Sequence, residues 1–263
     1  MEKAMTMCSE QFGRYFSTQG MKVNKTKEEH IVFYPKKMER NLENGVVIKG
    51  RKEAETVKLL GLSVSTGYSF KTHCSKIISK TNQRLGHVRR LQKYLTPEKL
   101  QQVTDSLVLS ILRYGLEWSG RERSNLVRLQ KTLNVVLRML TKSSMYTSIR
   151  YMLSKTGLMN IKLQCSQQRM SLVRRCLMTE TTPITLTMVK FPKEKSRSGD
   201  YRSLIGNQTR YGEKSIITVG LDLLNGLGYG KLVQTSGRHP SKDNFNSKSS
   251  KYLKDKMDNG NVK

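Results

Sequence analysis

Acidic residues are scarce in this chain and missing from one long stretch of it. The 263 residues include 48 lysines and arginines but only 20 aspartates and glutamates, so the formal net charge is +28. No acidic residue lies between Glu55 and Glu98. A positive charge of this size favours a dense polyanion as partner. The phosphate backbone of nucleic acid is the commonest one, and anionic lipid headgroups are the alternative.

Long hydrophobic runs are also missing. Apolar stretches such as Leu107–Leu112 are far shorter than the roughly 18 residues that a membrane span requires. The N-terminus carries Glu2, Lys3 and Glu10 and has no basic region followed by a hydrophobic one, so it does not resemble a signal peptide. We therefore expect an intracellular protein, in the nucleus or cytoplasm, with no membrane partner.

Clusters of metal-binding or catalytic residues are absent as well. The four cysteines, at positions 8, 74, 165 and 176, form no C-x-x-C pair, which argues against a zinc ribbon and a disulfide framework. The four histidines have no partners at ligand or triad spacing. All six aspartates lie at or beyond Asp105, and no two acids of the first part pair except Glu28 and Glu29, so the clustered carboxylates that two-metal phosphoryl transfer requires are missing there. We expect no metal site and no cofactor in this chain.

The first part of the chain, residues 1–66, has a mixed α/β pattern. Residues 1–18 predict a helix that stops at Gly20. Short β-branched and aromatic runs bounded by turn residues predict strands at Ile31–Tyr34, Val46–Ile48 and Thr56–Val64. Three short strands make a thin core, so they suggest the edge of a larger sheet. An exposed edge of this kind can also pair with a second copy of the chain.

From about Ser69 the hydrophobic period changes from 2 to 3.6, which predicts a helical bundle over 69–180. Apolar residues from Ile77 to Leu95 fall on one helical stripe. Thr96, Pro97 and Glu98 then supply a cap, a proline at the first helical position and an acid in the first turn of a second helix. A third helix is predicted from a Ser124 cap to Leu140, and shorter ones at about 146–155 and 160–178.

Beyond Pro183 the composition becomes polar and rich in Gly, Ser and Lys, which predicts a linker and a partly disordered basic tail from about Ser236. Three elements are expected there: a short strand or helix start at Ile216–Val219, a short helix at Leu221–Leu227 and a loosely docked helix at Tyr252–Met257. The fold class that the whole pattern predicts is α+β, mostly α.

The acid-free stretch predicts a nucleic-acid-binding surface. Lys76, Lys80 and Arg84 are spaced i, i+4, i+8 and form one row beside the apolar stripe. A solvated helix face usually mixes Glu with Lys, and this one does not. A basic surface without a ligand and an anionic-lipid contact remain the alternatives. The candidate nucleic-acid-binding residues are Lys58, Lys76, Lys80, Arg84, Arg89, Arg90 and Lys93.

A second basic set supports the same interpretation. It is interrupted only by Glu117 and Glu122. Its members are Arg113, Arg121, Arg123, Arg128, Lys131 and Arg138.

Short motifs spread along nearly the whole chain form a recognisable series. The first are G-M-K-V-N-K-T-K at Gly20–Lys27 and the following Ile31–Phe33. The next are K-L-L-G-L at Lys58–Leu62 and S-F-K-T-H at Ser69–His73. The remaining ones are Arg113–Gly115, Trp118–Gly120, Leu126–Arg138, Asp222–Asn225 and Phe245–Leu253. In this order they resemble the end of the palm, the thumb and the C-terminal region of non-LTR (LINE-like) retrotransposon reverse transcriptases.

The resemblance implies a truncated RNA-directed DNA polymerase. It assigns residues 1–66 to the end of the palm, 67–145 to the thumb helical bundle, 146–185 to further helices and 186–263 to a basic linker and C-terminal region. The family's F/Y-x-D-D box and an earlier aspartate precede the equivalent of residue 1 here. An intact member uses these carboxylates to bind Mg²⁺, so this chain is expected to be inactive alone.

Lys27 is the single catalytic candidate that the resemblance offers. It matches the lysine sometimes assigned as the acid that protonates departing pyrophosphate, although Glu28 replaces the threonine usual beside it. The expected partners are DNA, RNA or an RNA–DNA hybrid, with self-association through an exposed sheet edge. The alternative is a basic nucleic-acid-binding structural or RNA-packaging protein that shares these segments without polymerase ancestry.

Overall fold

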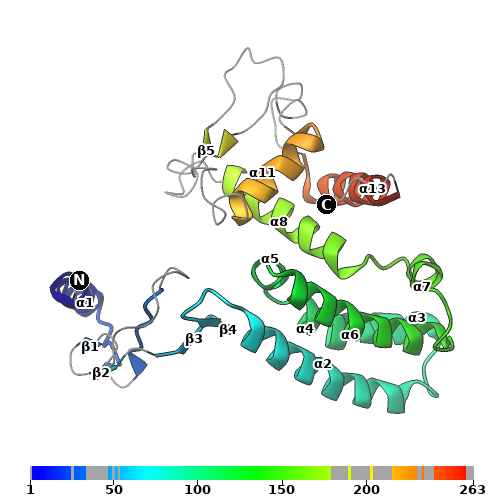
Figure 1. The fold of residues 1–263 in the computed structure, drawn as a ribbon, viewed down its shortest axis with the longest axis horizontal. Helices are drawn as coiled ribbons and strands as arrows, with labels where there is room; N and C mark the ends of the chain where they lie inside the picture. Colours follow the sequence, from blue (N-terminus) through cyan, green and yellow to red (C-terminus); the bar gives the residue numbers. More distant parts are fainter. Residues whose placement is uncertain are drawn as a thin grey trace. The chain divides into compact units, whose positions relative to one another are not determined.

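A computed structural model describes residues 2–24, 27–33, 47–48, 51–52, 54–178, 189–190, 202–203, 215–229, 233 and 240–258. The chain divides into two compact units, Met1–Lys76 and Ile77–Lys263 (Figure 1). The fold is α+β and mostly helical, as the sequence predicts.

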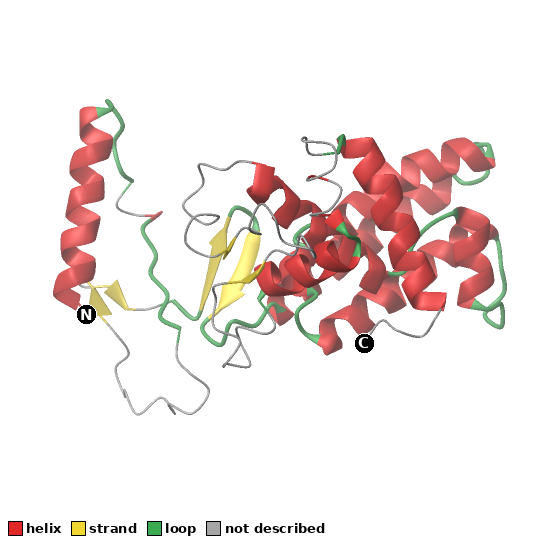
Figure 2. Cartoon of the chain, turned by 90° about the horizontal axis from the view of Figure 1, so that it is seen from above, coloured by secondary structure: helices red, strands yellow, loops and turns green. Residues whose placement is uncertain are grey.

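The described residues of the first unit include helix α1 and two strand pairs (Figure 2, strands in yellow). Helix α1 (Glu2–Thr18) confirms the helix predicted at 1–18. Strands β1 (Val47–Ile48) and β2 (Arg51–Lys52) form one antiparallel pair. Strands β3 (Thr56–Leu59) and β4 (Leu62–Ser65) form a second pair, and no sheet among the described residues joins the two.

Two of the strand predictions were wrong in detail. Residues 31–33 form no strand, and Tyr34 lies outside the described residues. The backbone of this segment makes a contact from Ala54 N–H to the His30 carbonyl (2.9 Å), which does not extend into a ladder. The segment Thr56–Val64 is a hairpin and not one strand, because Leu60 and Gly61 both have positive φ, 48° and 88°, and reverse the chain between β3 and β4.

The hairpin is fixed to the start of helix α2 (Lys71–Leu91) through Ser63, which is buried. The Ser63 backbone N–H donates to Nδ1 of His73 (3.4 Å). The Ser63 hydroxyl accepts a hydrogen bond from Nζ of Lys76 (3.0 Å). Phe70 and Cys74 add buried apolar surface at the same junction. The first turn of α2 therefore packs on β4.

In the second unit, the helix predicted at Pro97 is confirmed. Helix α3 (Pro97–Thr104) begins with the Thr96 side chain accepting from the Lys99 backbone N–H. A π-helical segment, η2 (Asp105–Leu109), and helix α4 (Ser110–Arg113) continue it, and α5 (Leu116–Ser119) follows. The predicted Ser124 cap is wrong. Helix α6 (Arg123–Thr141) has its N-cap at Glu122, so Ser124 lies within its first turn.

Helix α6 supplies much of the core of this bundle. Leu129, Leu133, Val136 and Leu137 are fully buried on one stripe, as a 3.6-residue period requires. Helices α7 (Ile149–Thr156) and α8 (Ile161–Met178) pack against α6 and confirm the two shorter helices predicted there.

The last part of the chain is more ordered than the sequence predicts. Helix α11 (Ile216–Gly226) packs on α8, and α13 (Lys242–Asp258) packs there too. Phe245 and Leu253 of α13 are 1% and 0% exposed, so the predicted disordered tail is wrong over 240–258, and Tyr252–Met257 belongs to a longer, firmly packed helix.

A further strand pair lies in the segment predicted as a linker. Strands β5 (Val189–Lys190) and β6 (Arg202–Ser203) pair there, and the rest of the predicted linker up to residue 214 lies outside the described residues.

Candidate nucleic-acid interface

The predicted basic residues of α2 lie on different sides of the helix. At 100° per residue, Lys80 and Arg84 project on one side of the buried stripe that contains Leu85, Arg89 projects on the other side, and Arg90 lies opposite the stripe. All four basic side chains are exposed. Lys80 and Arg84 therefore share one side of α2, as the predicted row requires, and Arg89 does not extend it.

Three other candidates occupy separate positions. In the first unit, Lys58 stands opposite Ser63 in the β3–β4 ladder, and Lys76 donates to the Ser63 hydroxyl, so both lysines are neighbours of one serine. In the second unit, Nζ of Lys93 lies 4.8 Å from the centre of the Tyr94 ring.

Lys27, the catalytic candidate, is exposed. Its backbone N–H donates to the Asn24 carbonyl (3.0 Å). Glu28 and Glu29 follow it directly, and Glu28 is partly buried. The described residues therefore define no second catalytic group beside the Lys27 amine.

A cavity of about 640 Å³ lies where the end of α2 meets the end of α6. Three of its lining residues are cations, namely Arg89, Arg138 and Lys142. None of the described residues that line the cavity is acidic. Two hydrogen bonds hold its walls: Gln92 donates to the Met139 carbonyl (3.1 Å), and Arg138 donates to the Met145 carbonyl (3.4 Å). We call this cavity the α2–α6 cavity.

Arg138 lines the α2–α6 cavity beside Arg89 and Lys142. Its Nε atom is buried and has no hydrogen-bond partner in the part of the chain that the structure describes, and the same is true of Nε of Arg174, so this atom does not by itself indicate a ligand. The exposed cations of the lining carry the argument instead. A phosphate oxygen is an acceptor that pairs strongly with a guanidinium. The arrangement therefore fits an anion with several oxygens.

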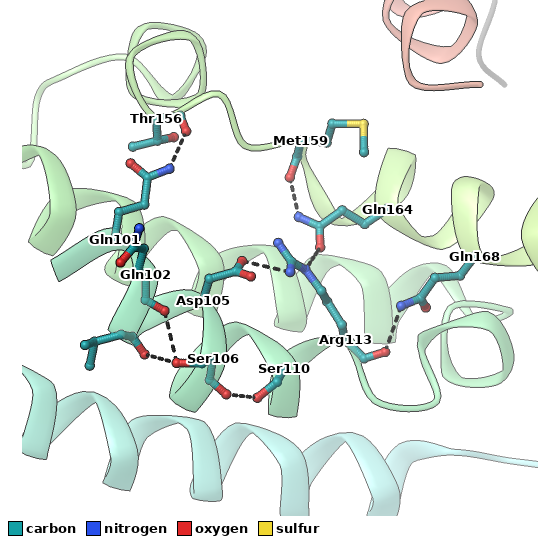
Figure 3. A network of polar contacts seen from close by, with 11 residues as sticks. Gln101, Gln102, Asp105, Ser106, Ser110, Arg113, Thr156, Met159, Gln164 and Gln168 are labelled. Atoms are coloured by element: carbon teal, nitrogen blue, oxygen red, sulfur yellow. Dashed lines mark hydrogen bonds and ion pairs between the residues drawn. The ribbon is translucent and has the colours of Figure 1, made fainter. Parts of the chain in front are cut away.

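Arg113, from the second basic set, has a structural role instead (Figure 3). Its guanidinium forms an ion pair with Asp105 (2.8 Å) and donates through Nε to Oε1 of Gln164 (3.0 Å). Its carbonyl accepts from Nε2 of Gln168 (3.1 Å). These contacts connect the π-helical segment and α4 to α8, so Arg113 stabilises the bundle.

The acidic and sulfur groups of the described residues are the candidate ligands for a metal ion. The described His, Cys, Asp and Glu residues form no group of three that could hold a metal ion, and Asp105 is paired with Arg113, so the residues present do not fit a two-metal centre. Burial raises the pKa of the Cys165 thiol from 9.0 to about 11, which Arg169 partly opposes and Glu117 reinforces. This thiol is protonated at neutral pH and is a poor nucleophile.

Sequence reasoning found Arg89 and Arg138 separately but did not bring them together, because 49 positions separate them in the chain. Among the described helices, none is both long and apolar enough to cross a membrane. Comparison of the chain with protein-family models, with curated proteins and with solved structures finds no match. Its function is therefore inferred from the chemistry of the described residues.

Proposed function

We propose that this chain binds nucleic acid through the phosphate backbone, without dependence on base sequence. The observation that carries the proposal is the α2–α6 cavity, which three cations line and which has no acid among its described lining residues. The net charge of +28 supports it, because phosphate binding releases condensed counterions and is favoured by a positive field.

The basic side of α2 is a second phosphate-binding surface in this proposal. Lys80 and Arg84 are exposed there, Arg90 is exposed opposite the buried stripe, and no acidic residue occurs on this helix. Because Arg89, which lines the α2–α6 cavity, lies across the buried stripe of α2 from Lys80 and Arg84, the contributions of the two surfaces to binding are separable by mutation.

Salt titration tests the proposal. The wild type, a cavity variant (Arg89→Gln, Arg138→Gln, Lys142→Gln) and a row variant (Lys80→Gln, Arg84→Gln, Arg90→Gln) would each be titrated with duplexes of unrelated sequence. The slope of log K against log salt is expected to fall by roughly 0.9 for each phosphate that is no longer neutralised, about equally for every sequence. Circular dichroism of each variant provides the folding control. If both variants keep the slope of the wild type, the proposal fails.

We further propose that the chain is a fragment of a non-LTR reverse transcriptase that is inactive alone. The series of motifs supports this, as does the order of elements, a hairpin at Lys58–Leu62 followed by a helical bundle. Pure protein with primer–template, nucleotides and Mg²⁺ should incorporate no nucleotide. Template-directed incorporation would overturn the predicted inactivity.

Ligand preference separates this ancestry from the alternative of an RNA-packaging protein. A fragment of a polymerase thumb should bind duplex or RNA–DNA hybrid more tightly than single-stranded RNA of equal length. The reason is that a thumb contacts the phosphates of a nucleic acid in helical geometry. A packaging protein should favour the single strand, whose bases are open to contact. Competition among the three ligands at one salt concentration measures the preference.

A further inference from the structure

A second and larger cavity, of about 860 Å³, lies between helices α6, α7 and the start of α8. It is formed entirely within the second unit and is separate from the α2–α6 cavity. On α6 its lining residues include Leu126 and Gln130, which lie about a third of a turn around the helix axis from Arg138 and Lys142. We call it the α6–α7 groove.

The floor of the α6–α7 groove is aliphatic. Helix α6 contributes Leu126 and Val127, and α7 contributes Ile149 and Leu153, which are spaced i, i+4 and lie on one side of that helix. Val127 and Ile149 are 48% and 38% exposed. Two helices therefore present an unfilled apolar trough of the kind into which the apolar face of a third helix packs.

The rim of the groove is positively charged. Arg121, Arg123, Arg150 and Lys162 line it, and none of the lining residues is acidic. Arg121 lies in the turn before α6, and Arg123 is the first residue of α6. Arg150 lies on α7, and Lys162 lies at the start of α8. Four cations in the lining make the potential of the rim positive, which favours an anionic ligand.

The amide side chains of the groove hold its walls together. Oε1 of Gln130 accepts from the Ile161 backbone N–H (2.9 Å), and its Nε2 donates to Asn134 (2.8 Å). Oδ1 of Asn160 accepts from the Leu163 backbone N–H (2.8 Å). None of the described residues that line the groove is aromatic, whereas single-stranded nucleic acid is usually held by stacking on aromatic rings. An aliphatic floor with a basic rim suits a different anion.

We propose that the α6–α7 groove binds an amphipathic peptide helix that carries acidic residues beside aliphatic anchors. The anchors would fill the trough over Leu126, Val127, Ile149 and Leu153, and the carboxylates would pair with the rim cations, which also favours rapid association. This function goes beyond phosphate binding. It assigns the chain an acidic protein partner on a surface distinct from the α2–α6 cavity.

Fluorescence anisotropy of the full chain tests this proposal. The probes are a labelled 16-residue peptide with Leu at helical i, i+3, i+4, i+7 spacing and Glu at the remaining exposed positions, a scrambled peptide of the same composition, and a peptide with Gln in place of Glu. We expect the first peptide to bind at least tenfold more tightly than either of the others, because helical spacing and charge are both required. Equal binding of the scrambled peptide would overturn the proposal, and so would no binding at millimolar concentration.

Matched substitutions on α7 locate the binding site. Arg150→Glu should weaken peptide binding about tenfold, whereas Lys155→Glu, with the same charge change on the opposite side of α7, should alter it less than threefold. Ile149→Ser should likewise lower affinity more than the exposed control Tyr151→Ser. If Arg150→Glu instead weakens oligonucleotide binding more than Lys155→Glu does, and oligonucleotide displaces the peptide, the groove belongs to nucleic acid and the proposal is wrong.

Discussion

Arginines in two regions of the second unit have different surroundings. Arg174 on α8 is 6% exposed, donates to the Pro240 carbonyl and places its guanidinium 4.9 Å from the centre of the Phe245 ring. Arg89 on α2 is exposed and lines a cavity that contains other cations. The first holds α13 on the bundle, and the second raises the local positive potential. Net charge alone therefore overstates the charge that is available to a ligand.

Arg174→Met should produce the largest loss of stability. The change removes a charged hydrogen bond and a cation–π contact but keeps most of the side-chain volume, so we expect the free energy of unfolding to fall by about 2–3 kcal/mol. Hydrogen exchange should rise first in α13. The neighbouring exposed Arg175→Met is the matched control and should change stability by less than about 0.5 kcal/mol. Equal effects of the two would show that Arg174 does not hold α13.

Arg113→Met should cost less, about 1–2 kcal/mol. Its ion pair adds little, because the Asp105 side chain is 51% exposed. The larger loss comes from Gln164, which is buried and would lack the donor to its Oε1. Chemical denaturation of Arg113→Met, Gln164→Leu and the double variant measures the coupling. If the two effects simply add, the Arg113–Gln164 bond contributes nothing to stability.

Helix positions were predictable where the signal was local. Thr96 and Pro97 lie next to each other in the sequence, and the structure begins α3 there. The hairpin turn was missed because leucine rarely adopts positive φ, so Leu60 gave no sign of a turn. Helix α13 was underestimated because its buried stripe contains Ser249 between Phe245 and Leu253, and a polar residue interrupts the apolar period.

The candidate site was predictable only in part, because its composition depends on tertiary packing. The sequence identified Arg89 as basic, but its proximity to Arg138 and Lys142 follows from how the end of α2 meets the end of α6. Arg113 could not be separated from these residues, since its partner Gln164 is 51 positions away. A charge pattern thus predicts the sign of a surface but not which cations remain on it.

The buried Cys165 thiol should make the stability of the chain depend on pH. Burial raises the thiol pKa to about 11 in the folded chain, and Arg169 lowers it partly. The unfolded thiol therefore ionises first, so stability is unaffected below pH 9 and falls as pH rises from about 9 to 11. At pH 10 this contribution should be about 1 kcal/mol. Denaturation at pH 7, 8.5 and 10 should show a smaller decline for Cys165→Ala. Parallel declines would contradict the assigned cause.

The smallest effect on stability is expected on the exposed side of α2. The double variant Lys80→Gln, Arg84→Gln lowers the net charge from +28 by two, and both side chains are exposed. Because the chain repels itself at this charge, the free energy of unfolding should stay within about 0.5 kcal/mol of the wild type at high salt and rise slightly at low salt. Urea denaturation measures the free energy of unfolding at low salt, about 20 mM, and at high salt, about 500 mM, where screening is strong. A loss near 1 kcal/mol at both salt concentrations would place Lys80 and Arg84 with Arg113 and Arg174, as cations that hold the fold, and would remove them from the proposed interface.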